Sequence, residues 1–198
     1  MYYDVIIAGF GGQGILLVGN ILASAAMMEG KHVTYLPTYG VEMRGGTANC
    51  TVVFSTKEIG SPVIGKPLSA IIMNTPSLMK FANHLKPGGF LLLNSSLVNP
   101  LNFSRQEVEL VSIPLNEIAS QLGNAKLANM VALGAYVEKT RVINDTSIPD
   151  ALINVLDERH HGMIPANLEA VRIGRDFIRD LQSVGRNTGK QWAGTNDV

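Results

Sequence analysis

The chain has 198 residues, of which 46% are hydrophobic and 16% are charged, and its 16 Lys and Arg residues balance 16 Asp and Glu residues. This length suffices for one domain with a full core, and the zero net charge argues against binding to nucleic acid or to a membrane surface. The single cysteine excludes a disulfide within the chain and a cluster ligated by its own thiolates, which usually takes about four. A charged fraction below the usual ~25% also suggests a subunit of a larger assembly.

The first part of the chain predicts a β-α-β unit. An apolar run at residues 5–8 suits a buried strand, a helical stripe of apolar residues begins at Ile15, and a second strand is expected at residues 33–36. This order favours a parallel strand pair with a right-handed crossover. Residues 5–28 carry no charge, but their glycines indicate a strand, a turn and a helix instead of a membrane span. No secretory signal is expected, because Asp4 stands where a basic residue belongs.

The middle of the chain does not continue this alternation of strands and helices. Residues 47–55 alternate in polarity and predict a strand with Cys50 on its apolar face, and a reducing, cytoplasmic setting fits the free thiol. We expect residues 57–65 to return antiparallel to this strand as a β-hairpin insertion, which makes the sheet mixed. Further strands are predicted at residues 68–73, 90–93 and 108–113, with a helix from about Pro76 between the first two.

After Pro114 the pattern becomes helical, with helices expected at residues 115–121, 126–140, 148–156 and 167–181. The fold class that follows is α/β: a Rossmann-like three-layer domain with a mixed, mainly parallel sheet, a β-hairpin insertion and a helical C-terminal part. We expect residues 1–182 to form this single domain. Residues 183–198 are rich in Gly and Asn and are expected to be a flexible tail, or a tail that Trp192 anchors on a neighbouring subunit.

A glycine-rich turn lies between the first predicted strand and the first predicted helix. Residues 9–14 read Gly-Phe-Gly-Gly-Gln-Gly and fit the G-x-G-x-x-G pattern, whose free amides and helix end can hold a phosphate group. The same glycines would also serve merely to pack the helix on the sheet. Dinucleotide enzymes place Asp or Glu about 20 residues further on, whereas residues 35–38 read Tyr-Leu-Pro-Thr. A free-standing Rossmann-type nucleotide-binding oxidoreductase, or a methyltransferase, is therefore the minority interpretation.

Other catalytic patterns are absent from the sequence. It contains no Gly-x-Ser-x-Gly elbow, no Walker loop and no His-Glu-x-x-His motif. His160 and His161 adjoin Asp157 and Glu158, but a solvated helix end accounts for this cluster better than a metal site does. We therefore predict no catalytic residue and no metal ligand in this chain.

The most distinctive segment is residues 37–46, in which Glu42 and Arg44 stand among glycines and other uncharged residues. One interpretation is a mobile connection whose two charged side chains pair with each other. The other is a shaped loop that rises beside the glycine turn and presents the Arg44 guanidinium to an anion or to a partner chain.

Together, the two segments resemble a known family. Residues 11–14, Gly-Gly-Gln-Gly, and residues 39–50, Tyr-Gly-Val-Glu-Met-Arg-Gly-Gly-Thr-Ala-Asn-Cys, closely resemble the gamma subunit of the 2-oxoacid:ferredoxin oxidoreductases. The two motifs in this order are far more specific than the glycine turn alone, and the similarity runs over roughly residues 1–180. Val41 stands where many relatives carry Pro, which should alter the stiffness of the loop.

The resemblance implies an enzyme built from several chains. Such enzymes convert a 2-oxoacid and coenzyme A to an acyl-CoA and carbon dioxide, and they reduce ferredoxin. Thiamine diphosphate and the iron–sulfur clusters lie mainly on the alpha, beta and ferredoxin-like subunits in this family, so we expect this chain to bind no cofactor alone and to be inactive when isolated. The resemblance mildly favours 2-oxoglutarate or a branched-chain 2-oxoacid as the substrate. Pyruvate is not excluded, because pockets on other subunits select the 2-oxoacid.

On this interpretation the chain supports assembly and takes a share in the coenzyme A entrance. The candidate residues for coenzyme A, another anion or a subunit interface are Gly11, Gly12, Gln13, Gly14, Tyr39, Glu42, Arg44, Gly45 and Gly46. Small and apolar residues at 127–134 suit broad permanent contacts with the other subunits. An isolated chain is expected to self-associate through such surfaces as a homo-oligomer.

Overall fold

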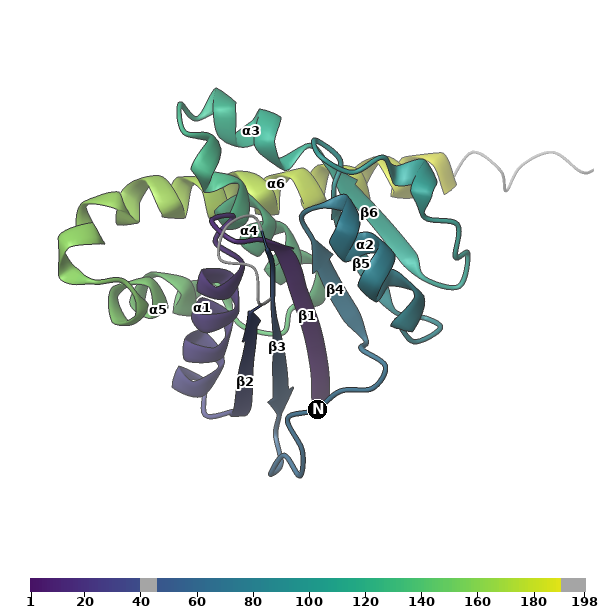
Figure 1. Ribbon diagram of the computed structural model, residues 1–198. Coiled ribbons are helices and arrows are strands. Elements are labelled where there is room, and N and C mark those ends of the chain that lie inside the picture. The colour runs from purple at the N-terminus through teal and green to yellow at the C-terminus, as the bar shows by residue number, and fades with distance from the viewer. Residues whose placement is uncertain (40–45, 190–198) are drawn as a thin grey trace, which may run out of the picture.

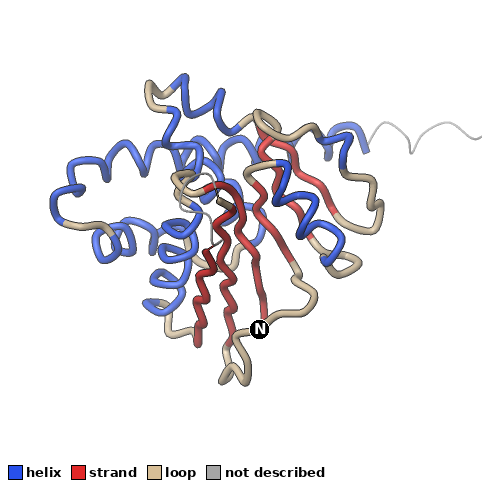
Figure 2. Tube along the Cα trace, viewed as in Figure 1, coloured by secondary structure: helices blue, strands red, loops and turns tan. Residues whose placement is uncertain are grey.

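The computed structural model describes residues 1–39 and 46–189. Its middle layer is a six-stranded sheet in the order β2-β3-β1-β4-β5-β6 (Figure 1). The strands are β1 (Tyr2–Phe10), β2 (His32–Tyr39), β3 (Thr47–Ser55), β4 (Ser69–Ile72), β5 (Phe90–Asn94) and β6 (Glu109–Ile113). The α-helices are α1 (Ile15–Met28), α2 (Thr75–Phe81), α3 (Leu115–Gln121), α4 (Ala128–Thr140), α5 (Ile148–Val155) and α6 (Ile164–Gly189), shown in blue in Figure 2.

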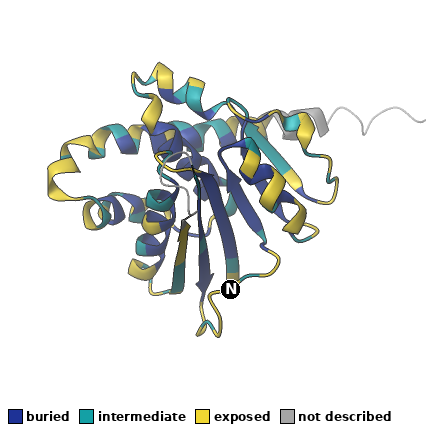
Figure 3. Ribbon diagram, in the orientation of Figure 1, coloured by how far each residue is buried: buried dark blue, intermediate teal, exposed yellow. Residues whose placement is uncertain are grey.

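Helices cover both faces of the sheet. Alternation along β1 sends Val5 and Ile7 into a large apolar cluster with α1, α4, α5 and α6, and sends Ile6 and Ala8 into a smaller cluster with α2. The central strands are buried on both faces, as Figure 3 shows. This three-layer arrangement confirms the predicted α/β fold class with its mixed sheet, in which β1, β4, β5 and β6 are parallel.

The position of β3 corrects two sequence-based expectations. β3 lies between β1 and β2 and is antiparallel to both, so β1 and β2 run in the same direction without being neighbours. Residues 56–68 form no strand, so the predicted hairpin of residues 47–55 with 57–65 is wrong. The physical reason is that β3 already has a partner on each side, whereas most side chains at 56–65 are exposed and cannot form the second half of a buried pair.

Helix α4 corrects a third expectation. Its residues from Ala128 to Glu138 are all buried within the chain, between the sheet and α6. The small residues that suggested subunit contacts instead allow α4 to approach α6 closely, because a Cβ atom at Gly134 would meet the backbone of Val171. The prediction that residues 127–134 contact other subunits is therefore wrong.

The last helix is longer than predicted. α6 begins at Ile164 and continues past the expected domain boundary at residue 182 to Gly189. The rest of the expected tail, including Trp192, lies outside the described residues. Within residues 1–39 and 46–189, none of the helices combines the length and the apolar character that crossing a bilayer requires.

Candidate functional site

The turn after β1 adopts a conformation that only glycine enters easily. Gly12 has φ 92° and Gly14 has φ 72°, both in the left-handed region. Gly14 also lies against α4, where a Cβ atom would come within 2.0 Å of the Asn129 amide nitrogen. The sequence Gly-Gly-Gln-Gly thus lets α1 begin directly at the end of the central strand, with its first amides at the carboxyl edge of the sheet.

Gln13 holds this turn together. Its side-chain oxygen accepts a hydrogen bond of 2.6 Å from the amide of Phe10, and its side-chain nitrogen donates one of 3.4 Å to the carbonyl of Met73. Met73 follows β4, so Gln13 links the ends of two neighbouring parallel strands. Gly9 leaves room for this side chain, because a Cβ atom there would lie 2.5 Å from the Gln13 oxygen.

The second sequence motif meets the glycine turn at one point that the structure describes. The amide of Gly11 donates a hydrogen bond of 3.1 Å to the carbonyl of Gly46, the residue that precedes β3. Tyr39 is the last residue of β2. Glu42, Arg44 and Gly45 lie outside the described residues, so their predicted roles stay predictions. The described ends of the second motif, Tyr39 and Gly46, therefore lie at the same edge of the sheet as the glycine turn.

A crevice of about 190 Å³ opens beside the turn, at the carboxyl edge of the sheet. Gly12 and Gln13 follow β1, and Met73 follows β4. The other lining residues come from the start of α3, from the 3₁₀ turn at Ala125–Leu127 and from the start of α4; they are Asn116, Ala125, Lys126 and Ala128. The chain leaves β1 toward β2 and β3 on one side and returns as β4 on the other. Open α/β sheets bind their ligands at such a switch point.

The crevice suits an anionic group. No acidic side chain lines it, and Lys126 makes no ion pair within the part of the chain that the structure describes. The N-terminus of α1 has no side-chain cap and no acidic residue in its first turn, so its amides and its dipole face the turn. The cavity is smaller than the roughly 300–1,000 Å³ of typical sites for whole small molecules. A single phosphate or carboxylate group fits it better than a dinucleotide.

The end of β2 does not provide a ribose site. The hydroxyl of Tyr35 donates to the carbonyl of Leu16 and packs β2 against α1, and no carboxylate occurs at residues 35–38. The dinucleotide interpretation therefore lacks the acidic residue that would distinguish it.

Cys50 is a packing residue. Its side chain is fully buried on β3, and its sulfur donates to the carbonyl of Ile15 at 3.7 Å. Burial raises the pKa of this thiol to about 12, so it stays protonated near neutral pH. His160 and His161 lie in a 3₁₀ segment before α6, and the described residues contain no group of three or more potential metal ligands.

Sequence reasoning missed Asn116 and Lys126 as crevice residues. Lys126 was placed at the start of a helix, but its neighbour Gly12 lies far away in the chain, and no local pattern joins the two. The N-cap Asn124, whose side chain accepts from the amide of Lys126, was the available signal for a helix start at this point.

Comparison with known proteins now identifies the family. The model of the pyruvate ferredoxin/flavodoxin oxidoreductase family matches residues 4–177. The chain belongs to this family. It is 32% identical over 183 residues to the 2-oxoglutarate synthase subunit KorC of Methanocaldococcus jannaschii, a match that covers 91% of this chain and 96% of KorC. It is 45% identical over 175 residues to the ketoisovalerate oxidoreductase subunit VorA of Methanothermobacter thermautotrophicus, which covers 88% of this chain but 36% of VorA. The chain thus spans about a third of the VorA length.

Solved structures of oxidoreductases share the fold. The gamma subunit of a keto/oxoacid ferredoxin oxidoreductase from Geobacter sulfurreducens matches with a TM-score of 0.74 and 27% identity, over 90% of this chain and 99% of that chain. A 2-oxoglutarate:ferredoxin oxidoreductase from Magnetococcus marinus matches with a TM-score of 0.80 over 90% of this chain and 31% of that chain; its 23% identity shows the fold alone. The resemblance to gamma subunits stated from the sequence is confirmed.

Proposed function

We propose that this chain is the gamma-type subunit of a multi-subunit 2-oxoacid:ferredoxin oxidoreductase. The whole enzyme would convert a 2-oxoacid and coenzyme A to an acyl-CoA and carbon dioxide, with ferredoxin as the electron acceptor. The observation that carries this proposal is the family match over residues 4–177, joined to the nearly complete overlap with KorC. Alpha, beta and ferredoxin-like subunits are the partners that the proposal requires.

The redox cofactors do not fit this chain. An iron–sulfur cluster usually takes about four cysteine thiolates, whereas Cys50 is alone, buried and bonded to a backbone carbonyl. Among the residues that the structure describes, none that lines the crevice is a carboxylate that could hold a metal-bound diphosphate. In the proposed enzyme, thiamine diphosphate and the clusters are held by the other subunits, and this chain contributes no catalytic residue.

The contribution proposed for this chain is a share in the coenzyme A entrance. The related Magnetococcus marinus enzyme is described with coenzyme A bound. Coenzyme A carries phosphate groups, and the crevice offers the amide of Gly12, the end of α1 and the cationic Lys126 to one such group. The loop that carries Arg44 joins β2 to β3 at the same edge and would add a guanidinium.

Assembly is tested by purification. A tagged chain from its native cell should carry the alpha, beta and ferredoxin-like subunits with it, and the reassembled enzyme should reduce ferredoxin in a reaction that depends on coenzyme A. The isolated chain should show no turnover and no saturable binding of NAD, NADP or S-adenosylmethionine. Robust turnover by the isolated chain would refute the proposal in favour of a free-standing nucleotide-binding oxidoreductase.

The coenzyme A role is tested in the assembled enzyme. Arg44→Ala and Lys126→Gln should each raise the KM for coenzyme A, by roughly tenfold for a lost charge-assisted hydrogen bond. Lys57→Gln serves as the matched control, because Lys57 is exposed beyond the end of β3, at the opposite edge of the sheet. If the two variants impair assembly and leave the KM unchanged, the glycine turn and its loop form a subunit interface only.

The substrate preference is a finer proposal. Relatives named for ketoisovalerate and for 2-oxoglutarate match this chain at 45% and 32% identity. We expect the assembled enzyme to use a branched-chain 2-oxoacid or 2-oxoglutarate in preference to pyruvate. Comparison of kcat/KM for the three acids checks this expectation, and a preference for pyruvate would contradict it.

A further inference from the structure

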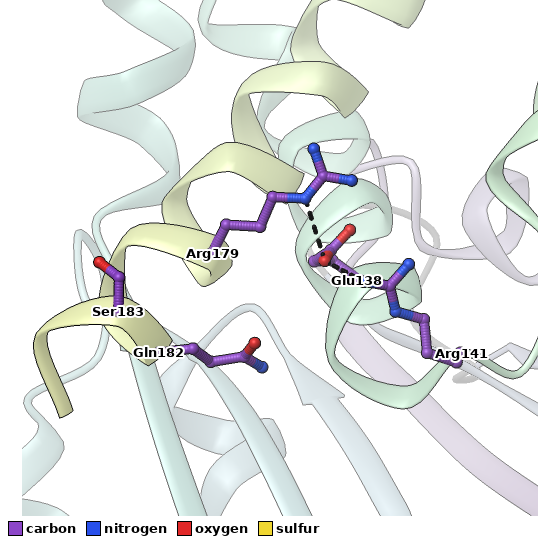
Figure 4. A pocket seen from close by; sticks show the side chains of 5 residues that line it. All are labelled: Glu138, Arg141, Arg179, Gln182 and Ser183. Atoms are coloured by element: carbon purple, nitrogen blue, oxygen red, sulfur yellow. Dashed lines mark hydrogen bonds and ion pairs between the residues drawn. The ribbon is translucent and has the colours of Figure 1, made fainter. Parts of the chain in front are cut away.

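A second cavity lies at the other end of α4. Helix α4 begins at the glycine-turn crevice with Ala128 and ends at Thr140, which places the two ends about 20 Å apart. The second cavity has a volume of about 320 Å³ and lies between the end of α4 and the later part of α6 (Figure 4). The residues that line it are Glu138, Arg141, Arg179, Gln182 and Ser183.

A buried carboxylate holds arginines at this cavity. The side chain of Glu138 is only 1% exposed and pairs with Arg141, with Arg179 at 3.1 Å and with Arg175 at 3.5 Å. Arg175 has a second acidic partner, Asp145. Arg141 and Arg179, the two arginines that line the cavity, therefore share one carboxylate, and the side chains lining the cavity carry one excess positive charge.

Asp176 offsets part of this excess. It lies 3.7 Å from Arg179 and 2.6 Å from Arg172, which Glu169 also holds, on the exposed face of α6. It is not among the residues that line the cavity. Asp176 is thus shared between Arg172 and Arg179, and the lining keeps part of its excess positive charge.

Both cavity arginines retain unused donors. A guanidinium has five N–H groups in a planar fork. Among the described residues, Arg141 uses only its Nη2 atom, for Glu138, and the Nη2 atom of Arg179 has no partner. The structural Arg105 differs, because its nitrogens bond to Glu107 and to the carbonyl oxygens of Ala82 and Leu85.

The backbone at Arg141 gives an independent indication. Arg141 has φ 54° and is the only non-glycine residue at positive φ in the described ranges. It occupies the left-handed position that ends α4, where Gly or Asn is usual because other side chains are strained there. Backbone strain of this kind is concentrated at functional sites, where the position of the side chain matters more than a low-energy backbone conformation.

We infer that this cavity binds an oxyanion, a carboxylate or phosphate group, between the guanidinium groups of Arg141 and Arg179. Glu138 orients the two arginines and offsets part of their repulsion, while their free N–H groups donate to the oxyanion. Gln182 and Ser183 line the wall formed by α6; the Gln182 amide can add a neutral hydrogen bond, whereas the Ser183 hydroxyl already donates to the carbonyl of Asp180. The group comes either from a small molecule in solution or from an acidic side chain of a partner chain.

The test is a titration of the full chain with sodium phosphate and with succinate, at constant ionic strength set by chloride. The arginine Nε–Hε resonances of Arg141 and Arg179 should shift saturably in nuclear magnetic resonance spectra. Arg141→Gln and Arg179→Gln should each weaken binding at least tenfold. Arg159→Gln is the matched control, because Arg159 is 75% exposed, pairs with Asp157 and lies outside the cavity.

The outcomes divide clearly. Shifts that fail to saturate, or equal weakening in Arg159→Gln, would overturn the inference, and the wild-type titration decides this even if a variant fails to fold. Repeating the titration on the assembled enzyme separates the two sources of the oxyanion. Binding that persists there assigns a small molecule, whereas binding that is lost on assembly assigns a carboxylate of a partner chain.

Discussion

Gly134 of α4 lies directly against the backbone of Val171 on α6: a Cβ atom at Gly134 would be 1.9 Å from the Val171 carbonyl oxygen. The relationship is reciprocal, because a Cβ atom at Gly174 of α6 would be 2.0 Å from the carbonyl oxygen of Val131. Real Cβ atoms do not approach oxygen so closely. The two helices therefore pack at a separation that only glycine at both positions permits.

Gly134→Ala is expected to reduce the free energy of unfolding by about 3 kcal/mol, at the upper end of overpacking costs. The added methyl group would meet backbone atoms of α6, which cannot rotate away as a side chain can. Chemical denaturation measures the loss. Gly162→Ala is the control, because an added Cβ there meets nothing within 4 Å, and its effect should stay within about 0.5 kcal/mol. Equal stability of the two variants would contradict the close helix packing.

Glu29 should make folding stability depend on pH. Burial raises the pKa of this carboxyl, but hydrogen bonds from Lys31, the Asn144 amide and Ser147 outweigh that effect and leave the pKa below its ordinary value. A carboxyl with a lowered folded-state pKa contributes stability above its unfolded-state pKa, near 4.3. That contribution is lost as the pH falls through the lower, folded-state value.

Glu29→Gln removes this contribution and should cost about 1 kcal/mol at pH 7. The difference from wild type should shrink as the pH falls below about 4. Urea denaturation of both proteins across this range gives the comparison, with Glu58→Gln, at an exposed position in the segment after β3, as control. A difference that stays constant down to low pH would show that the charge of Glu29 is not responsible.

Cys50 should resist thiol reagents while the protein is folded. Its side chain is fully buried and its pKa is raised to about 12, so both access and thiolate are lacking at pH 8. Iodoacetamide should leave the native chain unmodified and should label it stoichiometrically in guanidinium chloride, as intact mass spectrometry would show. Rapid labelling of the native chain would mean that β3 opens readily.

Gln13→Glu should weaken coenzyme A binding if the crevice takes a phosphate group. A glutamate oxygen can still accept from the amide of Phe10, but it places a negative charge at the crevice and cannot donate to Met73. We expect the KM for coenzyme A in the assembled enzyme to rise about tenfold with a smaller change in kcat. Gln106→Glu, at an exposed position before β6, controls for net charge. An unchanged KM would remove the crevice from the coenzyme A path.

The positions of the helices and strands could be predicted from the sequence better than the pairing of the strands in the sheet. The buried strands and most helices follow from local periodicity, which can be read from one sequence alone. The pairing of β3 with β1 and β2 does not follow from periodicity, because strand pairing depends on contacts between distant segments. Residues 57–65 were chosen as the partner because they are close to β3 in the sequence. The mixed sheet was therefore correct, while the hairpin that was meant to produce it was not.

The candidate site shows the same division. Residues 11–14 and Gly46 were identified from their motifs, and the hydrogen bond from Gly11 to Gly46 joins them. Lys126 was missed because its proximity to Gly12 arises from the return of α4 to the carboxyl edge of the sheet. No local pattern encodes that return. The cavity at Arg141 was missed for the same reason, since α4 and α6 form it together.

The antiparallel course of β3 also has a practical use. One end of this strand lies at the glycine turn, while the other leads into residues 56–65, which are mostly exposed and lie at the far edge of the sheet (Figure 3). An affinity epitope or a fluorescent label inserted near Gly60 would therefore project away from the glycine-turn crevice and could report on complex formation without blocking it.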